Sequence, residues 1–263
     1  MQAPVYYRFD NGVAVITMDS PPANAFSDAL HDAFLAVLAE LQNLEVRAAI
    51  ITGSGRFFQA GGDMQRFLTL QTLDEARAFV KLAQDFMNAI AATPYPTIAA
   101  INGYALGGGL EIALACDIRL AATSALLGLP EARYGILAGA GGTQRLARLI
   151  GPGRAKLMMY SGRQLDARQA FEIGLVDGVV EDADLLAQAC SLAAEIANNS
   201  PLAVRQIKRC VDQGLGLPLT AALELEREYW AQLIPPGDYR EGVRAWFEKR
   251  APIYPYDPLP DVD

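Results

Sequence analysis

The sequence contains a single histidine, His31, which restricts the acid–base chemistry open to it. Ser-His-Asp catalysis needs a histidine beside an activated serine, and no GxSxG turn or HExxH zinc motif occurs. His31 falls beside the apolar stripe of a helix expected over residues 27–42, so we expect a solvent-exposed side chain. Any catalytic acid or base must therefore be a carboxylate, Lys, Tyr or Cys.

Glu111 is the carboxylate whose surroundings most favour chemistry. It follows three consecutive glycines, residues 107–109, at the expected start of a helix. The unpaired N–H groups of a helix start, together with the positive end of its dipole, can face an anionic oxygen. The helix is otherwise apolar on all sides and should be buried, which would raise the pKa of Glu111. A glutamate held only by the helix dipole is the alternative.

Two further segments are ambiguous by themselves. Glu131 follows Pro130 in an expected loop, where an exposed carboxylate is the ordinary interpretation. The loop over residues 60–63 contains two glycines and an aspartate, and alone it indicates only a tight connection. Neither glycine-rich stretch, 53–55 or 139–141, completes a GxGxxG motif, and no P-loop motif occurs.

The elements that must position these residues follow an α/β pattern. Asn11 and Gly12 predict a hairpin turn between two short strands. Further strands are expected at four places, the first two of them buried, and a capping box at Thr72 and Glu75 predicts the start of a second long helix. These strands span residues 48–52, 97–101, 117–121 and 176–180. From residue 184 onward the pattern is almost wholly helical, so we place a boundary near residue 200.

The composition excludes several classes of protein. With 263 residues, 52% of them hydrophobic, the chain can bury a full core. A net charge of −8 argues against a nucleic-acid-binding surface, and three cysteines without CxxC spacing indicate neither a disulfide framework nor a metal site. The chain shows no signal-peptide pattern and no long apolar run, so we expect no membrane partner and a cytoplasmic location.

Four motifs, read together, resemble the enoyl-CoA hydratase/isomerase family, the crotonases. They occupy residues 57–63, 102–118, 127–131 and 139–146, and the resemblance extends from about residue 20 to residue 252. It implies an α/β crotonase fold, a spiral of repeated ββα units with a helical C-terminal region. We therefore expect a spiral core over residues 1–200 and a helical trimerisation region over 201–263. The assembly implied is a homotrimer or a dimer of trimers.

The resemblance also implies a set of site residues. Glu111 and Glu131 would be the catalytic pair, and the backbone N–H groups of Gly62 and Gly108 would form an oxyanion hole for a thioester carbonyl. Residues expected to bind the acyl-CoA substrate are Ala23, Ala25, Ala60, Gly62, Asp63, Met64, Gln65 and Gly108.

The implied activity is the addition of water across the 2,3 double bond of a trans-2-enoyl-CoA, with no cofactor beyond the coenzyme A of the substrate. The alternatives are double-bond isomerisation, a hydratase for branched or aromatic acyl groups, and a non-catalytic assembly subunit.

Two departures from the family pattern leave the substrate open. Gln65 replaces a frequent lysine, so Arg66, Lys249 and Arg250 are candidates for phosphate contacts, with ordinary surface charge as the alternative. Residues 234–236, Ile-Pro-Pro, fall where the family covers the acyl or coenzyme A pocket.

Overall fold

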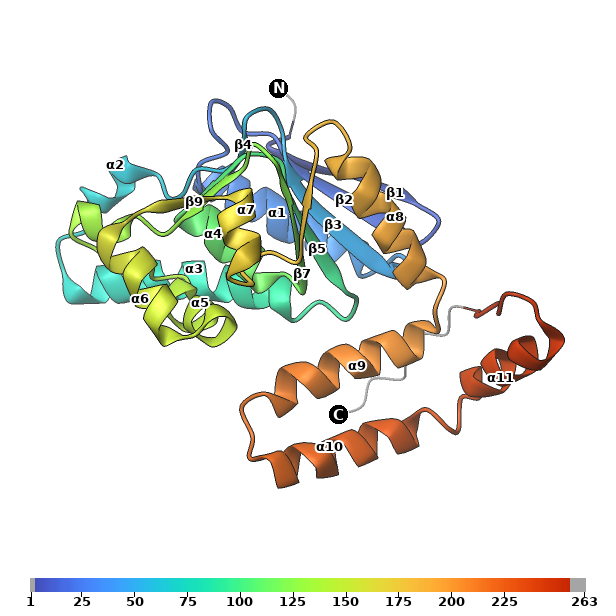
Figure 1. The fold of residues 1–263 in the computed structure, drawn as a ribbon. Helices are drawn as coiled ribbons and strands as arrows, with labels where there is room; N and C mark the ends of the chain where they lie inside the picture. The colour runs from blue at the N-terminus through green and yellow to red at the C-terminus, as the bar shows by residue number, and fades with distance from the viewer. Residues whose placement is uncertain (1–2, 256–263) are drawn as a thin grey trace.

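The structure, a computed structural model, describes residues 3–255 and confirms the α/β pattern. The expected hairpin is formed by β1 (Val5–Asp10) and β2 (Val13–Met18), which pair antiparallel. Both turn residues between them, Asn11 and Gly12, have positive φ, as the dipeptide predicted. The hairpin forms one edge of the larger sheet (Figure 1).

That larger sheet has six strands in the order β1-β2-β3-β5-β7-β10. The remaining members are β3 (Ala48–Gly53), β5 (Thr97–Ile101), β7 (Ile118–Ala122) and β10 (Gly178–Val180), all joined in parallel. Every residue of β5 is buried, and β3 is buried except for its last residue, as expected for parallel strands covered on both faces. The four strands predicted from apolar runs are therefore confirmed.

A second, four-stranded sheet was not predicted from apolar runs, because its strands have only three residues each. It consists of β4 (Phe57–Gln59), β6 (Tyr104–Leu106), β8 (Leu126–Gly128) and β9 (Gln164–Asp166), in that order. Three times in succession a strand of the large sheet is followed by a strand of the small one and then by a helix. This recurrence is the ββα repeat that the family resemblance implied.

Glycines stand where the chain passes from one sheet to the other. A Cβ on Gly53 would lie 2.1 Å from the carbonyl oxygen of Phe57, and one on Gly103 would lie 2.1 Å from that of Arg56. No side chain fits at such distances, so the passages require glycine. These two tight passages bring the glycine-rich loops at residues 60–63 and 107–109 beside one another.

The helices begin and end near the predicted signals. They are α1 (Asp28–Leu41), α2 (Met64–Phe67), α3 (Leu73–Ala91), α4 (Gly108–Ala115), α5 (Gly142–Ile150), α6 (Pro152–Ser161), α7 (Ala167–Glu172), α8 (Leu185–Ala197), α9 (Pro201–Gly214), α10 (Leu219–Gln232) and α11 (Asp238–Glu248), with a 3-10 turn at Glu131–Tyr134. The capping box at Thr72 and Glu75 is present at the start of α3. Seven of the eight residues of α4 are buried, which confirms the expectation for this helix.

The prediction that His31 is exposed was wrong. Its side chain is 8% exposed and lies against the rings of Phe26 and Phe86, with centroid distances of 5.7 and 5.3 Å. The helical periodicity of α1 placed it beside the core stripe, but α3 also packs on this side of α1, through Phe86. His31 does not line the cavity described below, which agrees with a chemistry that does not use histidine.

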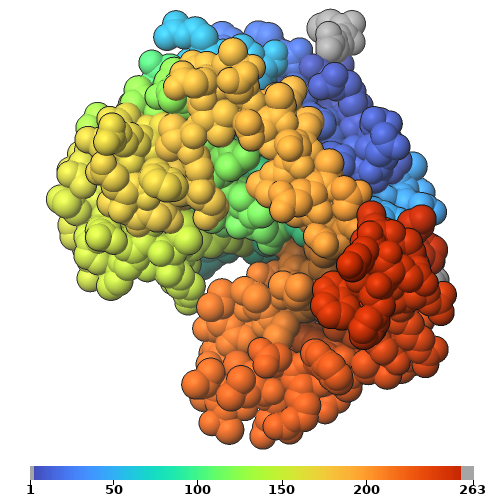
Figure 2. Space-filling model, turned by 45° about the vertical axis from the view of Figure 1, so that its right-hand side comes forward, coloured from blue at the N-terminus to red at the C-terminus, as the bar shows by residue number. Residues whose placement is uncertain are grey.

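The last three helices, α9, α10 and α11, lie below the two sheets and their covering helices (Figure 1). A groove of about 1230 Å³ separates α9 from the body of the molecule, and Figure 2 shows the same separation as a deep indentation. The division at residue 200 stays a prediction, and the expected second region, 201–263, ends outside the described residues.

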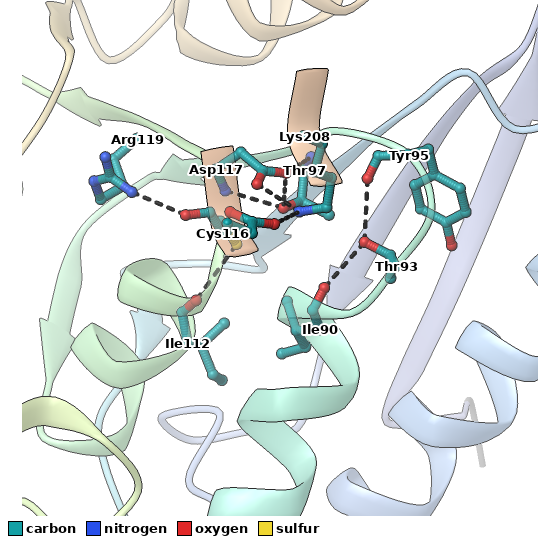
Figure 3. A network of polar contacts seen from close by, with 10 residues as sticks. Ile90, Thr93, Tyr95, Thr97, Ile112, Cys116, Asp117, Arg119 and Lys208 are labelled. Carbon is teal, nitrogen blue, oxygen red and sulfur yellow. Dashed lines mark hydrogen bonds and ion pairs between the residues drawn. The ribbon is translucent and has the colours of Figure 1, made fainter. Parts of the chain in front are cut away.

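A polar network joins α9 to the large sheet at the bottom of this groove (Figure 3). The ammonium group of Lys208 lies 2.5 Å from one carboxylate oxygen of Asp117. The other oxygen accepts hydrogen bonds from the backbone N–H and the hydroxyl of Thr97, at 2.7 and 2.9 Å. The Lys208 side chain is 8% exposed, so this ion pair lies in a largely dry environment that strengthens it.

Candidate active site

The two glutamates selected from the sequence line one cavity. The cavity has a volume of about 930 Å³ and lies where the start of α4, the helix α3 and the loops before α2 and α5 meet. Glu111 comes from the first turn of α4, and Glu131 begins the 3-10 turn that follows β8. Residues twenty positions apart in the sequence are thus brought to the same wall.

The three glycines before Glu111 differ in what their positions require. Gly107 has a φ of 54°, in the left-handed region that favours glycine, and donates its N–H to the carbonyl oxygen of Gly128 at 2.9 Å. A Cβ on Gly109 would lie 2.1 Å from the carbonyl oxygen of Gln59. Gly108 is the first residue of α4, so its N–H has no acceptor in a preceding turn of the helix.

Gly62 belongs to the second glycine loop of the site, which lies between β4 and α2 and contacts the start of α4. It forms an isolated parallel bridge with Phe26, in which the Phe26 N–H donates to Gly61 and the Asp63 N–H donates to Phe26. In such a bridge the N–H of Gly62 itself points away from Phe26. A Cβ on Gly108 would lie 3.8 Å from the Cα of Gly61, so the two glycine loops are in contact. Both Gly62 and Gly108 line the cavity.

Glu111 is 4% exposed and is held by the first residue of α5. Its Oε1 atom accepts a hydrogen bond of 2.7 Å from the backbone N–H of Gly142. Burial raises the pKa of Glu111 to about 7, although the backbone hydrogen bond from Gly142 lowers it and the nearby charge of Glu131 raises it. Near neutral pH this carboxyl group can therefore either hold or release a proton, as general acid–base catalysis requires.

Glu131 is half-buried, not the freely exposed carboxylate that its loop position alone would favour. Burial raises its pKa above the ordinary value. Its Oε1 atom would lie 3.0 Å from a Cβ on Gly107, and its Oε2 atom is buried without a hydrogen-bond partner in the described part of the chain. Buried carboxylate oxygens normally have a partner, so Oε2 is available to a substrate or a water molecule in the cavity.

The other predicted binding residues divide into two groups. Ala60, Gly62, Met64 and Gly108 line the cavity. Ala23, Ala25, Asp63 and Gln65 do not: the carbonyl oxygen of Ala23 accepts from the Ala60 N–H, and the Asp63 carboxylate caps α2 by accepting from the Gln65 N–H. These four residues support or flank the lining, and a contact between them and a substrate stays a prediction.

One wall of the cavity was missed from the sequence. Phe79, Val80 and Ala83 of α3 belong to the apolar helix face, which the pattern predicts to pack into the core. Only the C-terminal part of that face is buried, at Phe86, Met87 and Ile90, while the N-terminal part lines the cavity. The apolar stripe runs from Ala76 to Ile90, about four turns, and only its C-terminal half is buried; this excess length is the signal that was available.

Two of the three basic residues considered for phosphate contacts have carboxylate partners. Arg66 pairs with Asp28 and lies over the ring of Phe79, at 5.3 Å from its centroid. Arg250 pairs with Glu241 and Glu248. Residues 234–236, expected to cover the pocket, connect α10 to α11 and do not line the cavity within this chain. A role for these residues in covering the acyl or coenzyme A pocket stays a prediction.

The described residues 3–255 include no group of three or more His, Cys, Asp or Glu side chains arranged to hold a metal ion. Within the same range, no helix has the length and apolar character needed to span a bilayer.

Comparison with known proteins gives consistent matches over nearly the whole chain. A sequence profile of the enoyl-CoA hydratase/isomerase family matches residues 8–256. YngF of Bacillus subtilis, whose name leaves hydratase and isomerase both open, is 45% identical over 92% of this chain and 94% of its own. The crotonyl-CoA hydratase of Syntrophomonas wolfei is 41% identical over 90% of this chain and 92% of its own.

The crystal structure of an enoyl-CoA hydratase from Bacillus anthracis superposes with a TM-score of 0.92 at 39% identity, over 97% of this chain and 100% of that one. Similarity at this level extends through both sheets and the C-terminal helices.

Proposed function

Because the chain belongs to the enoyl-CoA hydratase/isomerase family, the crotonases, we propose that it adds water to a trans-2-enoyl-CoA thioester. It has the crotonase fold and is an enzyme of the crotonase type, with an acyl-CoA thioester as its class of substrate. Hydration, as opposed to isomerisation, is the part that we propose. The observation that carries it is the presence of two carboxyl groups, Glu111 and Glu131, on the wall of one cavity.

The proposed reaction uses these groups together. Water attacks the β-carbon of the enoyl group and loses a proton to one carboxylate, while the other carboxyl group delivers a proton to the α-carbon. Negative charge develops on the thioester oxygen during the attack, and the N–H groups of Gly62 and Gly108 stabilise it. Removing one donor of this kind from an enzyme costs about 3 to 4 kcal/mol of barrier.

The raised pKa values of Glu111 and Glu131 support this division into one acid and one base. Hydration needs one carboxylate and one carboxylic acid at the same time, and a pair of nearby carboxyl groups with raised pKa values retains a proton more readily near neutral pH. An isomerase moves a proton between two carbons of the substrate and needs only one such group. The second carboxyl group, that of the half-buried Glu131, therefore favours hydration.

We further propose that the reaction needs no cofactor, since carboxyl groups and backbone N–H groups suffice for it, and that the protein acts in the cytoplasm. A trimer, or a pair of trimers, is the proposed assembly. The observation that supports this assembly is an apolar surface on α11, where Val243, Trp246 and Phe247 are each more than half exposed. Sedimentation equilibrium tests the assembly, and a monomer at micromolar concentration would contradict it.

The test of the activity uses crotonyl-CoA, whose conjugated absorbance is lost on hydration. Glu111→Gln and Glu131→Gln keep the size of each side chain and remove only its ability to exchange a proton. We expect each to lower the hydration rate by orders of magnitude, since acid–base catalysis contributes about 10²- to 10⁴-fold. Near-normal turnover in either variant would refute the role assigned to that residue.

A further inference from the structure

Gln59 is a fully buried polar residue for which the proposed chemistry has no direct use. It is the last residue of β4, with an exposed fraction of 0%. The large majority of buried side-chain polar atoms have a hydrogen-bond partner. In this chain both partners of Gln59 belong to the same residue, which lies two positions further along the chain.

That residue is Gly61. The Gln59 Oε1 atom accepts from the Gly61 N–H at 2.8 Å, and the Gln59 Nε2 atom donates to the Gly61 carbonyl oxygen at 3.1 Å. The same carbonyl oxygen also accepts from the Phe26 N–H at 2.8 Å. The peptide groups on both sides of Gly61 are thus held by fixed hydrogen bonds.

The conformation held in this way is an unusual one. Gly61 has a φ of 102°, in the region that L side chains rarely adopt, and a Cβ there would lie 3.1 Å from the carbonyl oxygen of Leu106. Glycine is flexible and can leave such a conformation easily. The direction of the next N–H group, that of Gly62, depends on it directly, because the peptide joining Gly61 to Gly62 is planar.

Gln59 also touches the second glycine loop. Its Oε1 atom would lie 2.8 Å from a Cβ on Gly109 and 3.7 Å from one on Gly108, and its carbonyl oxygen would lie 2.1 Å from the Cβ on Gly109. One buried residue therefore lies between the two segments that contribute Gly62 and Gly108 to the cavity wall. A change in its side chain alters the spacing of both.

We propose that Gln59 is a positioning residue, which aims the N–H group of Gly62, and sets its spacing from Gly108, for the thioester oxygen of the substrate. It contacts neither substrate nor reacting atoms and acts through Gly61. The inference rests on the proposed oxyanion site, but it does not depend on whether the enzyme hydrates or isomerises its substrate.

The direct readout is polarisation of the bound thioester carbonyl. A cinnamoyl-CoA with a para-dimethylamino group has an absorption band that moves to longer wavelength when hydrogen bonds draw electrons toward its carbonyl oxygen. We expect this red shift with the unmodified protein and a clearly smaller one with Gln59→Ala. The rate constant kcat on crotonyl-CoA should fall roughly 10- to 100-fold with little change in KM, as for a misplaced oxyanion donor.

A second variant, Gln59→Glu, keeps the inference testable if Gln59→Ala does not fold. An ionised carboxylate can accept from the Gly61 N–H but cannot donate to the Gly61 carbonyl oxygen, whereas a protonated carboxyl group can do both. Relative to the unmodified protein, the red shift and kcat of this variant should therefore recover as the pH is lowered. A residue with a merely structural role would not produce such a recovery.

Gln206→Ala provides the matched control. Gln206 is also a buried glutamine, 3% exposed, but its amide donates to Gln232 between α9 and α10, away from the cavity. It should lower thermal stability and leave the red shift unchanged.

An unchanged red shift in both Gln59 variants, or its absence in the unmodified protein saturated with the probe, would overturn the inference. Failure of the proposed hydration is distinguishable, because the red shift would persist while crotonyl-CoA was not hydrated.

Discussion

Replacing Gly142 by alanine would insert a methyl group directly beside Glu111. The new Cβ would lie 2.9 Å from the Glu111 Oε1 atom, 2.9 Å from the Ala138 Cβ and 3.0 Å from the Leu129 Cδ1. Two of these contacts are closer than side chains tolerate and the third is very tight, so the carboxylate or the loop before α5 must move. Either movement lengthens the 2.7 Å hydrogen bond from the Gly142 N–H.

The size of the effect follows from that hydrogen bond. A hydrogen bond to a charged group contributes about 1.5 to 3 kcal/mol, which corresponds to a roughly 10- to 150-fold loss in rate if it is needed in the transition state. The same hydrogen bond lowers the pKa of Glu111, so its loss should move that pKa above about 7. Gly142→Ala should therefore show both a lower kcat and a pH–rate profile displaced to higher pH.

The assay is the loss of crotonyl-CoA absorbance, measured across pH for Gly142→Ala and for Gly153→Ala. Gly153 is an exposed position in α6 where an added Cβ meets nothing within 4 Å, so this control should retain normal rates and an unmoved profile. If Gly142→Ala matched the control in both respects, the Gly142 N–H would not be what holds the Glu111 carboxylate for catalysis.

Two further predictions concern stability. Because the pKa of Glu111 is raised from 4.5 to about 7, the folded protein binds this proton more tightly than the unfolded chain, and its contribution to stability is lost as the pH rises from about 4.5 through 7. Glu111→Gln has no such proton to lose. In urea titrations its free energy of unfolding, relative to that of the unmodified protein, should therefore rise by up to about 3 kcal/mol between pH 4 and 8. A difference that does not change with pH would contradict the raised pKa. Lys208→Met should lower the free energy of unfolding by about 3 kcal/mol, because it leaves Asp117 without its cation, and adding Asp117→Asn should recover part of the loss. Equal destabilisation by Lys208→Met in both backgrounds would show that the ion pair is not coupled.

Long apolar runs predicted the large sheet well, but the short strands of the four-stranded sheet were not predicted. Residues 48–52 and 97–101 are buried on both faces, so their composition alone identifies them. The strands β4, β6 and β8 are too short for a periodicity to be recognised, and their pairing depends on residues far apart in the chain. Only the family resemblance indicated the ββα repeat to which they belong.

The site was predictable where a residue conflicts with its own surroundings. Glu111 stands alone as a charge in an apolar helix after three glycines, and that conflict by itself indicates a function. Glu131 has no such signal, because an acidic residue in a loop is ordinary. The hydrogen bond from Gly142 reaches Glu111 from thirty-one positions further along the chain, and no local pattern contains that information.

The central claim is that Glu111 and Glu131 together add water to an enoyl-CoA thioester. Incubation with crotonyl-CoA in water enriched in heavy oxygen, followed by mass spectrometry of the acyl-CoA product, tests it most directly. The account predicts one solvent-derived oxygen atom on the β-carbon, and almost none formed in the same time by Glu111→Gln or Glu131→Gln. No solvent-derived oxygen on the β-carbon with the unmodified enzyme, or equal incorporation by either variant, would contradict the claim.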